Sequence, residues 1–125
     1  MATKAKTNRD KFRAATVGAK DSFKSSIVEL ETPDGITKAE VRQITLIDRK
    51  LCAERAKDKD GVFDILKCQA LQIIYSCYDP DNGELMFDDS DLDCLMNSYS
   101  GGFFDVLFQA ALDINDLTVD EAKKN

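Results

Sequence analysis

The segment that most constrains the fold is the apolar stretch VFDILKCQALQIIYSCY, from Val62 to Tyr78. Its apolar residues recur every three or four positions, which is the period of an α-helix. The apolar face would carry Val62, Leu66, Ala70, Ile73 and Cys77, with Phe63 and Ile74 beside them. The polar residues that fall opposite are Asp64, Gln69, Gln72 and Ser76. The pattern predicts a central core helix over residues 62–78, ended by Pro80.

Two stretches rich in β-branched and aromatic residues come before this helix, FKSSIVEL and GITKAEVRQI. The residues that join them include Pro33 and Gly35. Proline suits the first central position of a type I turn, and glycine can take the left-handed conformation that follows it. We therefore expect a β-hairpin over residues 23–44. Two strands alone are marginally stable in water, so the hairpin should pack against helices.

Three shorter helices complete the expected architecture. Thr45 and Asp48 have the spacing of a capping box, which predicts a helix over about residues 46–56. Ser90 and the acidic residues after it predict the start of a helix at about 91–97, and a double glycine separates this from a final helix at 103–116. The sequence thus predicts a mostly helical α+β fold, with an N-terminal β-hairpin packed on about four helices.

Length and charge distribution predict one domain with polar ends. A chain of 125 residues is long enough for a single core. Residues 1–20 have a net charge of +5 although the whole chain has −6, so the rest is strongly acidic. We expect a basic, flexible arm at 1–20, a globular domain at 21–117 and a polar tail at 118–125.

Composition argues against several classes of function. No apolar run approaches the roughly 20 residues that span a bilayer, and no signal-peptide core is evident, so a cytoplasmic protein is expected. The acidic body argues against specific nucleic-acid binding, although the basic arm could touch nucleic acid or an acidic partner. The chain has no histidine, and its four cysteines lack zinc-site spacing and predict reduced, mostly buried thiols. We therefore predict no enzyme, no cofactor, and no catalytic or metal-binding residue.

The acidic stretch DPDNGE, which begins at Asp79, raises the question of a calcium site. An EF-hand loop needs an oxygen ligand at position 5, glycine at position 6 and glutamate at position 12. Counted from Asp79, these positions hold Gly83, Glu84 and Ser90, so the glycine is one place early and the closing carboxylate is missing. The stretch instead predicts a turn, because asparagine followed by glycine tolerates positive φ.

The last helix has apolar residues around more of its circumference than a surface helix needs. One stripe consists of Phe103, Leu107, Ala110, Ile114 and Leu117, and a second consists of Phe104, Phe108 and Leu112. A helix on the surface of a small domain normally needs a single stripe. Either the helix is buried on most sides, or the second stripe meets a partner or another copy of the chain. The candidate partner-binding residues are Phe103, Phe104, Phe108 and Leu112.

The order of these segments resembles the tail assembly chaperones of long-tailed bacteriophages and prophages, over about residues 20–117. The long apolar helix ends in IIYSCYDPDNGELMFDDSDLDCL, and a small-residue break leads to FFDVLFQAALDIN. The most telling part is a turn of the form aromatic-D-P-x-x-G, followed by the aromatic Phe87, an acidic helix start and a terminal helix ending in A-L-x-I-N.

The resemblance implies a small, acidic, non-enzymatic protein of the infected or lysogenic bacterial cell. Such proteins associate with the phage tape-measure protein, help to recruit tail-tube protein, and are absent from the mature virion. Many also have a longer product made by ribosomal frameshifting. Two alternatives remain open at this point: a structural tail-completion or connector subunit of the particle, and a regulatory adaptor that binds a host protein.

Overall fold

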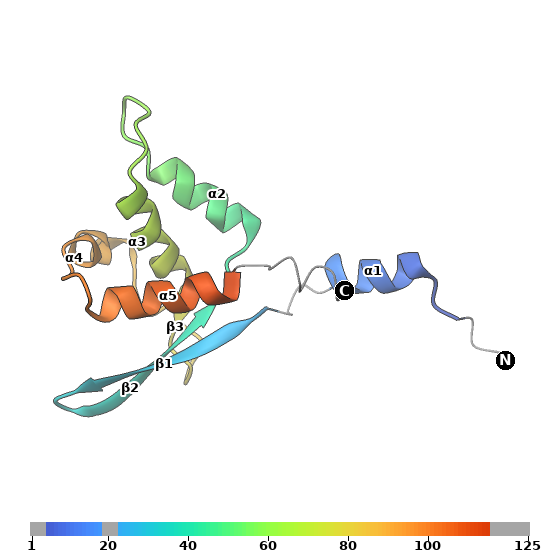
Figure 1. Cartoon of the computed structure of the whole chain (residues 1–125), viewed down its shortest axis with the longest axis horizontal. Helices are drawn as coiled ribbons and strands as arrows, with labels where there is room; N and C mark the ends of the chain where they lie inside the picture. Colours follow the sequence, from blue (N-terminus) through green and yellow to red (C-terminus); the bar gives the residue numbers. More distant parts are fainter. Residues whose placement is uncertain (1–4, 19–22, 116–125) are drawn as a thin grey trace.

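The computed structural model describes residues 5–18 and 23–115 (Figure 1). The elements in chain order are α1 (Asn8–Thr16), β1 (Ser25–Thr32), β2 (Gly35–Arg42), α2 (Leu46–Arg55), α3 (Ile65–Ser76), β3 (Cys77–Tyr78), the short 3₁₀ helix η1 (Asp89–Asp91), α4 (Leu92–Met96) and α5 (Phe103–Asn115). The predicted class, a mostly helical α+β fold with an N-terminal hairpin, is confirmed. A three-stranded antiparallel sheet in the order β1-β2-β3 takes the place of the expected two-stranded hairpin.

The hairpin forms where the sequence predicts it. Its register runs from the pair Ser25 and Arg42 to the pair Thr32 and Gly35, so only two residues form the connecting loop. Gly35 has a φ of +116°, a backbone conformation that favours glycine. The Thr32 hydroxyl donates to the Gly35 carbonyl at 2.7 Å and closes the turn. The hairpin is therefore predicted correctly, although it begins two residues later and ends two residues earlier than the predicted range of 23–44.

The predicted bounds of the core helix, 62–78, are wrong at both ends. At the start, the Asp64 side chain accepts a hydrogen bond from the Lys67 backbone N–H at 3.2 Å and caps the helix. Phe63, which precedes Asp64, forms an isolated β-bridge with Lys57, and this pairing keeps Phe63 out of the helix. At the end, the segment Cys77–Tyr78 leaves the helix and pairs with β2 as the strand β3. Helical periodicity alone could not reveal these long-range pairings.

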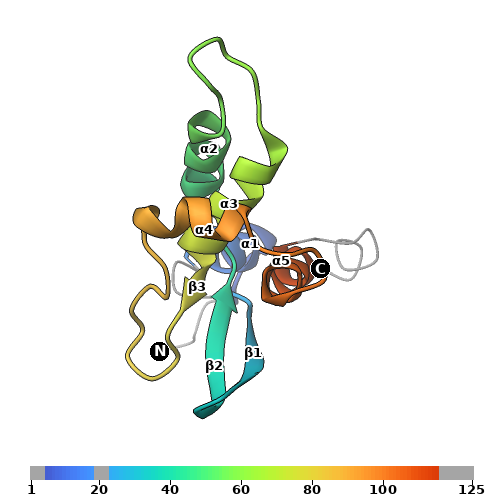
Figure 2. The same cartoon turned by 90° about the vertical axis from the view of Figure 1, so that its left-hand side faces the viewer.

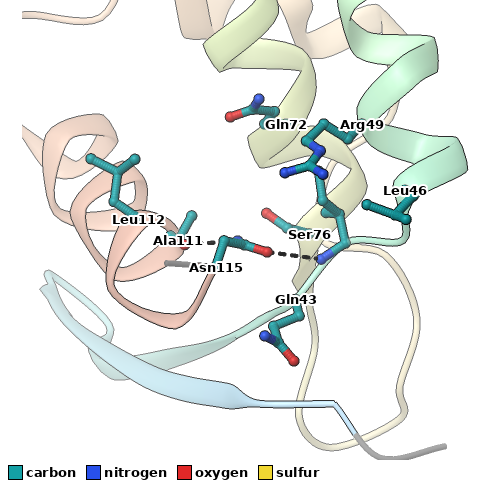
Figure 3. A pocket seen from close by; sticks show the side chains of 9 residues that line it. Gln43, Leu46, Arg49, Gln72, Ser76, Ala111, Leu112 and Asn115 are labelled. Carbon is teal, nitrogen blue, oxygen red and sulfur yellow. Dashed lines mark hydrogen bonds between the residues drawn. The ribbon is translucent and has the colours of Figure 1, made fainter. Parts of the chain in front are cut away.

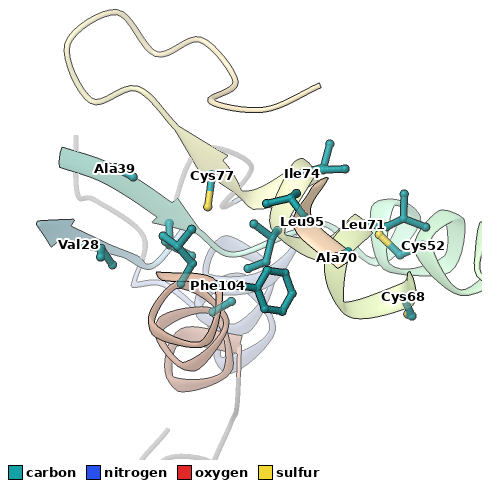
Figure 4. Close-up of a cluster of buried hydrophobic side chains, with 14 of the residues drawn as sticks. Val28, Ala39, Cys52, Cys68, Ala70, Leu71, Ile74, Cys77, Leu95 and Phe104 are labelled. Carbon is teal, nitrogen blue, oxygen red and sulfur yellow. The ribbon is translucent and has the colours of Figure 1, made fainter. Parts of the chain in front are cut away.

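Helix α3 is central to the core, which it shares with the hairpin and α5 (Figure 4). The buried apolar residues of α3 and its C-cap are Cys68, Ala70, Leu71, Ile73, Ile74 and Cys77. Ser76, which was expected on the polar face, is also buried, whereas Val62 and Leu66 from the expected apolar face are exposed. Because α2, α4 and α5 all pack against α3, its later turns are covered on several sides and its first turn is not.

Helix α5 lies across one face of the hairpin (Figures 1 and 2). On that face Val28 and Ala39 are paired across the strands and buried, as strand alternation requires. The far end of α5 is fixed to the chain that follows β2, because the Gln43 side chain donates to the Ile114 carbonyl at 2.8 Å. This contact sets the position of α5 relative to the start of α2.

The acidic helix start was predicted two residues too late. The cap is Asp88 instead of Ser90, and Asp88 and Asp91 form a reciprocal capping box that opens η1. The short 3₁₀ helix then continues directly into α4. For α2 the predicted N-cap residue is confirmed, since the Thr45 hydroxyl accepts from the Asp48 backbone N–H at 3.1 Å. The return bond from the Thr45 N–H to the Asp48 side chain, which a capping box would add, is not formed.

The predicted flexible arm at residues 1–20 contains α1 in its described part. A capping box of Thr7 and Asp10 starts this helix, and none of its side chains is buried. Flexibility of the arm stays a prediction. The predicted polar tail, 118–125, lies outside the described residues.

The thiols should divide into one reactive and three protected groups. Cys52, Cys68 and Cys77 are buried, whereas Cys94 is exposed on α4. Burial raises the pKa of Cys52 and of Cys77 to about 12, so at about pH 8 neither forms the reactive thiolate. With Ellman's reagent we expect only Cys94 to react rapidly in the native protein, and all four thiols to react in urea. Rapid reaction of a Cys94→Ser variant in the native state would contradict this arrangement.

Candidate partner-binding site

The structure divides the four candidate residues of α5 between the core and the surface. Phe104 is only 6% exposed, and its ring stacks on that of Phe108 with centroids 6.2 Å apart. Phe108 is half buried, and Phe103 and Leu112 are 43% and 39% exposed. Phe104 is thus a core residue in this structure, and contact with a partner is open to the other three. That these residues bind a partner stays a prediction.

The surplus of apolar residues on α5 has a structural explanation for part of the helix. One side of α5 covers the hairpin and another contacts α3, so Leu107 from the first stripe and Phe104 from the second are both buried. The second stripe emerges from the core as it continues, from buried Phe104 through half-buried Phe108 to exposed Leu112. Along this stripe, Leu112 near the C-terminal end of α5 is therefore the apolar residue that the core leaves exposed.

Leu112 lies at a cleft between α5 and α2 that has a cavity of about 370 Å³ (Figure 3). Its lining residues are Gln43, Ile44, Leu46, Arg49, Gln72, Ser76, Ala111, Leu112 and Asn115. We call this the α2–α5 cleft. Helices α2 and α5 supply its walls and α3 supplies residues between them (Figure 3).

The shape of the α2–α5 cleft is held by amide side chains. The Asn115 side chain accepts from the Ile44 backbone N–H at 3.4 Å and donates to the Ala111 carbonyl at 2.7 Å. Gln43 is held by its bonds to the Ile114 carbonyl and to the Lys24 backbone N–H. Because these amides are already engaged within the chain, they position the cleft and leave its other groups to meet a partner.

Two kinds of group remain available in the α2–α5 cleft. Leu46, the first residue of α2, is 73% exposed and provides apolar surface on the wall opposite Leu112. Arg49, one turn further along α2, is exposed and forms no ion pair with any described residue. Leucine side chains on two facing walls, beside a cation with no described ion-pair partner, suit an amphipathic helix that carries an acidic side chain. The residues that line the cleft include no histidine and no acidic residue.

Sequence reasoning found Leu112 and missed the opposite wall. Leu46 and Arg49 are more than sixty positions away, and only the packing of α2 and α5 on α3 brings them near Leu112. One local signal did exist. Leu46 and Ile47 directly follow the Thr45 cap, in a first turn where polar residues are usual, and both are 73% exposed.

The acidic stretch after β3 forms the turn that its sequence predicts. Gly83 has a φ of +74°, and its N–H donates to the Asp79 carbonyl at 2.8 Å. The Asp79 carboxylate accepts from the Asp81 N–H, and the Asn82 side chain accepts from the Glu84 N–H, both at 2.9 Å. Across the described residues, no group of three or more acids or cysteines is placed to hold a metal ion. None of the described helices is long and apolar enough to cross a membrane.

Comparison with known proteins gives a likeness in structure. No protein-family model matches the chain, and no curated protein matches it in sequence. Among solved structures there is a match. The chain is similar in fold to the bacteriophage HK97 tail assembly chaperone. The two share 16% sequence identity with a TM-score of 0.50, and the match covers 86% of this chain and 98% of the HK97 chain.

The match to the HK97 tail assembly chaperone extends over nearly that whole protein. The resemblance to tail assembly chaperones that the segment order indicates is therefore confirmed at the level of the fold. At this low identity, the likeness establishes how the chain folds, and what it binds has to be argued from its own surface.

Proposed function

We propose that the chain is a non-enzymatic tail assembly chaperone of a long-tailed bacteriophage or prophage. The observation that carries this proposal is the similarity in fold to the HK97 tail assembly chaperone, over 86% of this chain. The order of its sequence segments, considered without the structure, supports the same conclusion. In this role the chain binds the tape-measure protein and helps to recruit tail-tube protein during tail assembly.

The α2–α5 cleft is where the tape-measure protein binds in this proposal. A tape-measure protein is long and helical, and its apolar faces need cover before the tube forms around it. A helix laid between α2 and α5 would bury apolar side chains against Leu46 and Leu112, which are now 73% and 39% exposed. Burying apolar surface contributes about 25 cal/mol per Å², so a few such contacts provide useful affinity.

Charge makes the α2–α5 cleft selective for its partner and keeps the complex in solution. The guanidinium of Arg49, which pairs with no described acid, favours a bound helix with an acidic residue one turn from its apolar contacts. The net charge of −6 keeps the complex soluble by mutual repulsion. Both properties suit a protein that works in the bacterial cytoplasm and is released before the virion is complete.

Co-expression with the tape-measure protein of the same tail gene cluster tests this proposal. We expect the tape-measure protein to be largely insoluble alone, and to become soluble and co-elute with a tagged form of this chain. An unrelated acidic protein of similar size, expressed at the same level, controls for a general effect of charge. Equal solubility with either protein, or no co-elution, would contradict the proposal.

A further inference from the structure

Strand β2 has an open edge over half its length. On the side away from β1, β2 pairs with β3 only at Glu40 and Val41. Residues 35–39 of β2 continue beyond the end of β3, with the loop that follows β3 to one side (Figure 2). A strand edge without a partner presents a row of backbone donors and acceptors that can bind another chain.

The register shows which backbone groups face this open edge. Gln43 donates its N–H to the Lys24 carbonyl, so it faces β1. In an antiparallel pair the residues that bond to one neighbour alternate with those that face the other way. Lys38 and Ile36 therefore direct their N–H and C=O groups away from β1, as Glu40 does where it meets Tyr78. Within the described residues, neither Lys38 nor Ile36 has a partner for these groups.

The acidic turn explains why β3 stops where it does. Continuing the register that pairs Glu40 with Tyr78 would place Pro80 opposite Lys38. Proline has no N–H to donate to a ladder, and the bond from Gly83 to the Asp79 carbonyl turns the chain away. The stretch DPDNGE thus ends its own strand and leaves the edge of β2 free.

Two cavities flank the open edge. The first, of about 300 Å³, has an almost wholly apolar lining that includes Leu30, Ala39, Met86, Phe87, Phe103 and Leu107. The second, of about 390 Å³, lies beside Ile36, Asp79 and Asp81. Both are also lined by Thr37, Lys38 and Met86, so they meet at the open edge. A strand placed there would direct alternate side chains into an apolar space and toward two carboxylates.

We propose that an extended segment of a partner protein adds to the open edge of β2 as a fourth strand, and that this segment alternates apolar and basic residues. Its apolar side chains occupy the cavity walled by Phe87 and Phe103, and its basic side chains meet Asp79 and Asp81. The ammonium of Lys38, which also lines this cavity, pairs with Glu29 at 3.7 Å and forms no ion pair with Asp79 or Asp81. Backbone hydrogen bonds to Ile36 and Lys38 provide the affinity common to strand addition.

This surface is separate from the α2–α5 cleft, so the inference does not rest on the proposed function. No residue lines both the α2–α5 cleft and either of these two cavities. The variant Leu112→Glu tests the cleft without touching the strand edge. The two proposals can therefore fail independently.

A Lys38→Pro variant tests the edge directly. The Lys38 N–H points away from β1, so proline there removes one of the two backbone donors of the open edge while the hairpin keeps its own bonds. The matched control is Lys38→Ala, which removes the same ammonium and keeps the N–H. Circular dichroism and the melting temperature report whether both variants fold.

The probe is a capped octapeptide of alternating valine and lysine, with a valine–glutamate peptide for comparison. We expect the wild-type chain to bind the lysine peptide and its Ile36 and Lys38 amides to exchange at least about tenfold more slowly when it is bound. Affinity should fall at least about tenfold in Lys38→Pro, stay within about threefold in Lys38→Ala, and be at least about tenfold weaker for the glutamate peptide.

Two results would overturn the inference. The first is that the Ile36 and Lys38 amides of the wild-type protein exchange no more slowly at saturating or millimolar lysine peptide. This measurement uses the wild-type protein, so it does not depend on whether a variant folds. The second is slowed exchange of these amides without peptide, appearing as protein concentration rises, because a second copy of the chain would then occupy the edge.

Discussion

Phe104→Ala is expected to lower the free energy of unfolding by about 3–5 kcal/mol, as other truncations of buried phenylalanine do. Phe104 is 6% exposed, packs in the core with α3 and the hairpin, and stacks on Phe108. Its removal leaves a cavity between elements that are far apart in the sequence. Urea unfolding followed by circular dichroism measures the change.

The neighbouring Phe103 provides a matched control, because the residue type and the helix are the same. Phe103 is 43% exposed, and we expect Phe103→Ala to cost less than about 1 kcal/mol. Substitution with a charged residue should separate the two positions in the same way. Phe104→Glu should lose the helical circular dichroism signal, whereas Phe103→Glu should keep it. Equal costs for the two alanine variants would contradict the assignment of Phe104 to the core.

Leu112→Glu is expected to weaken binding to the tape-measure protein by about 30-fold or more, equivalent to roughly 2 kcal/mol. The substitution removes an apolar side chain from one wall of the α2–α5 cleft and adds a charge to a surface that buries apolar groups on binding. Leu112 is 39% exposed in the free protein, so helical content should be unchanged. Titration of the purified variant with the soluble segment of the partner gives the affinity.

Val106→Glu is the control for this second prediction. Val106 is also on α5 and is 48% exposed, but six residues of helix place it about 120° round from Leu112. It lies beside β1 and lines no part of the α2–α5 cleft. Similar losses of affinity in both variants would show that binding responds to added charge in general and would argue against the cleft.

The parts of the fold that depend on neighbouring residues could be predicted from the sequence. The hairpin follows from two β-branched stretches joined by a proline and a glycine, and Gly35 adopts the positive φ expected of it. The Thr45 cap and the turn at Gly83 are local in the same way. The hairpin turn, the cap and the turn at Gly83 are each determined by residues within four or five positions of one another.

Features that depend on distant contacts could not be predicted. Helical periodicity continues through Cys77 and Tyr78, yet pairing with β2 draws both into a strand. Ser76 was expected to face water, but α3 is covered on several sides and buries it. Phe104 is buried and Leu112 is exposed, although both belong to the same apolar stripe of α5. The difference depends on where α5 lies against α3 and the hairpin, which helical periodicity does not reveal.

The candidate site shows the same division. Leu112 could be identified from the sequence because its own helix has more apolar residues than a surface helix needs. Leu46 and Arg49 could not, because they reach the cleft only when α2 packs on α3. For the open edge of β2, Pro80 is a visible signal that a strand must stop. The strand that it stops, β3, becomes visible only in the structure.

The amount of this chain at successive stages of phage assembly distinguishes a chaperone from a subunit of the particle. Mass spectrometry would quantify it in complexes isolated with the tape-measure protein from producing cells, and again in purified virions. A tail assembly chaperone should be abundant in the complexes and absent from virions, where tube protein serves as the positive control. Its presence in virions in a fixed ratio to tube protein would contradict the account and identify a structural subunit of the particle.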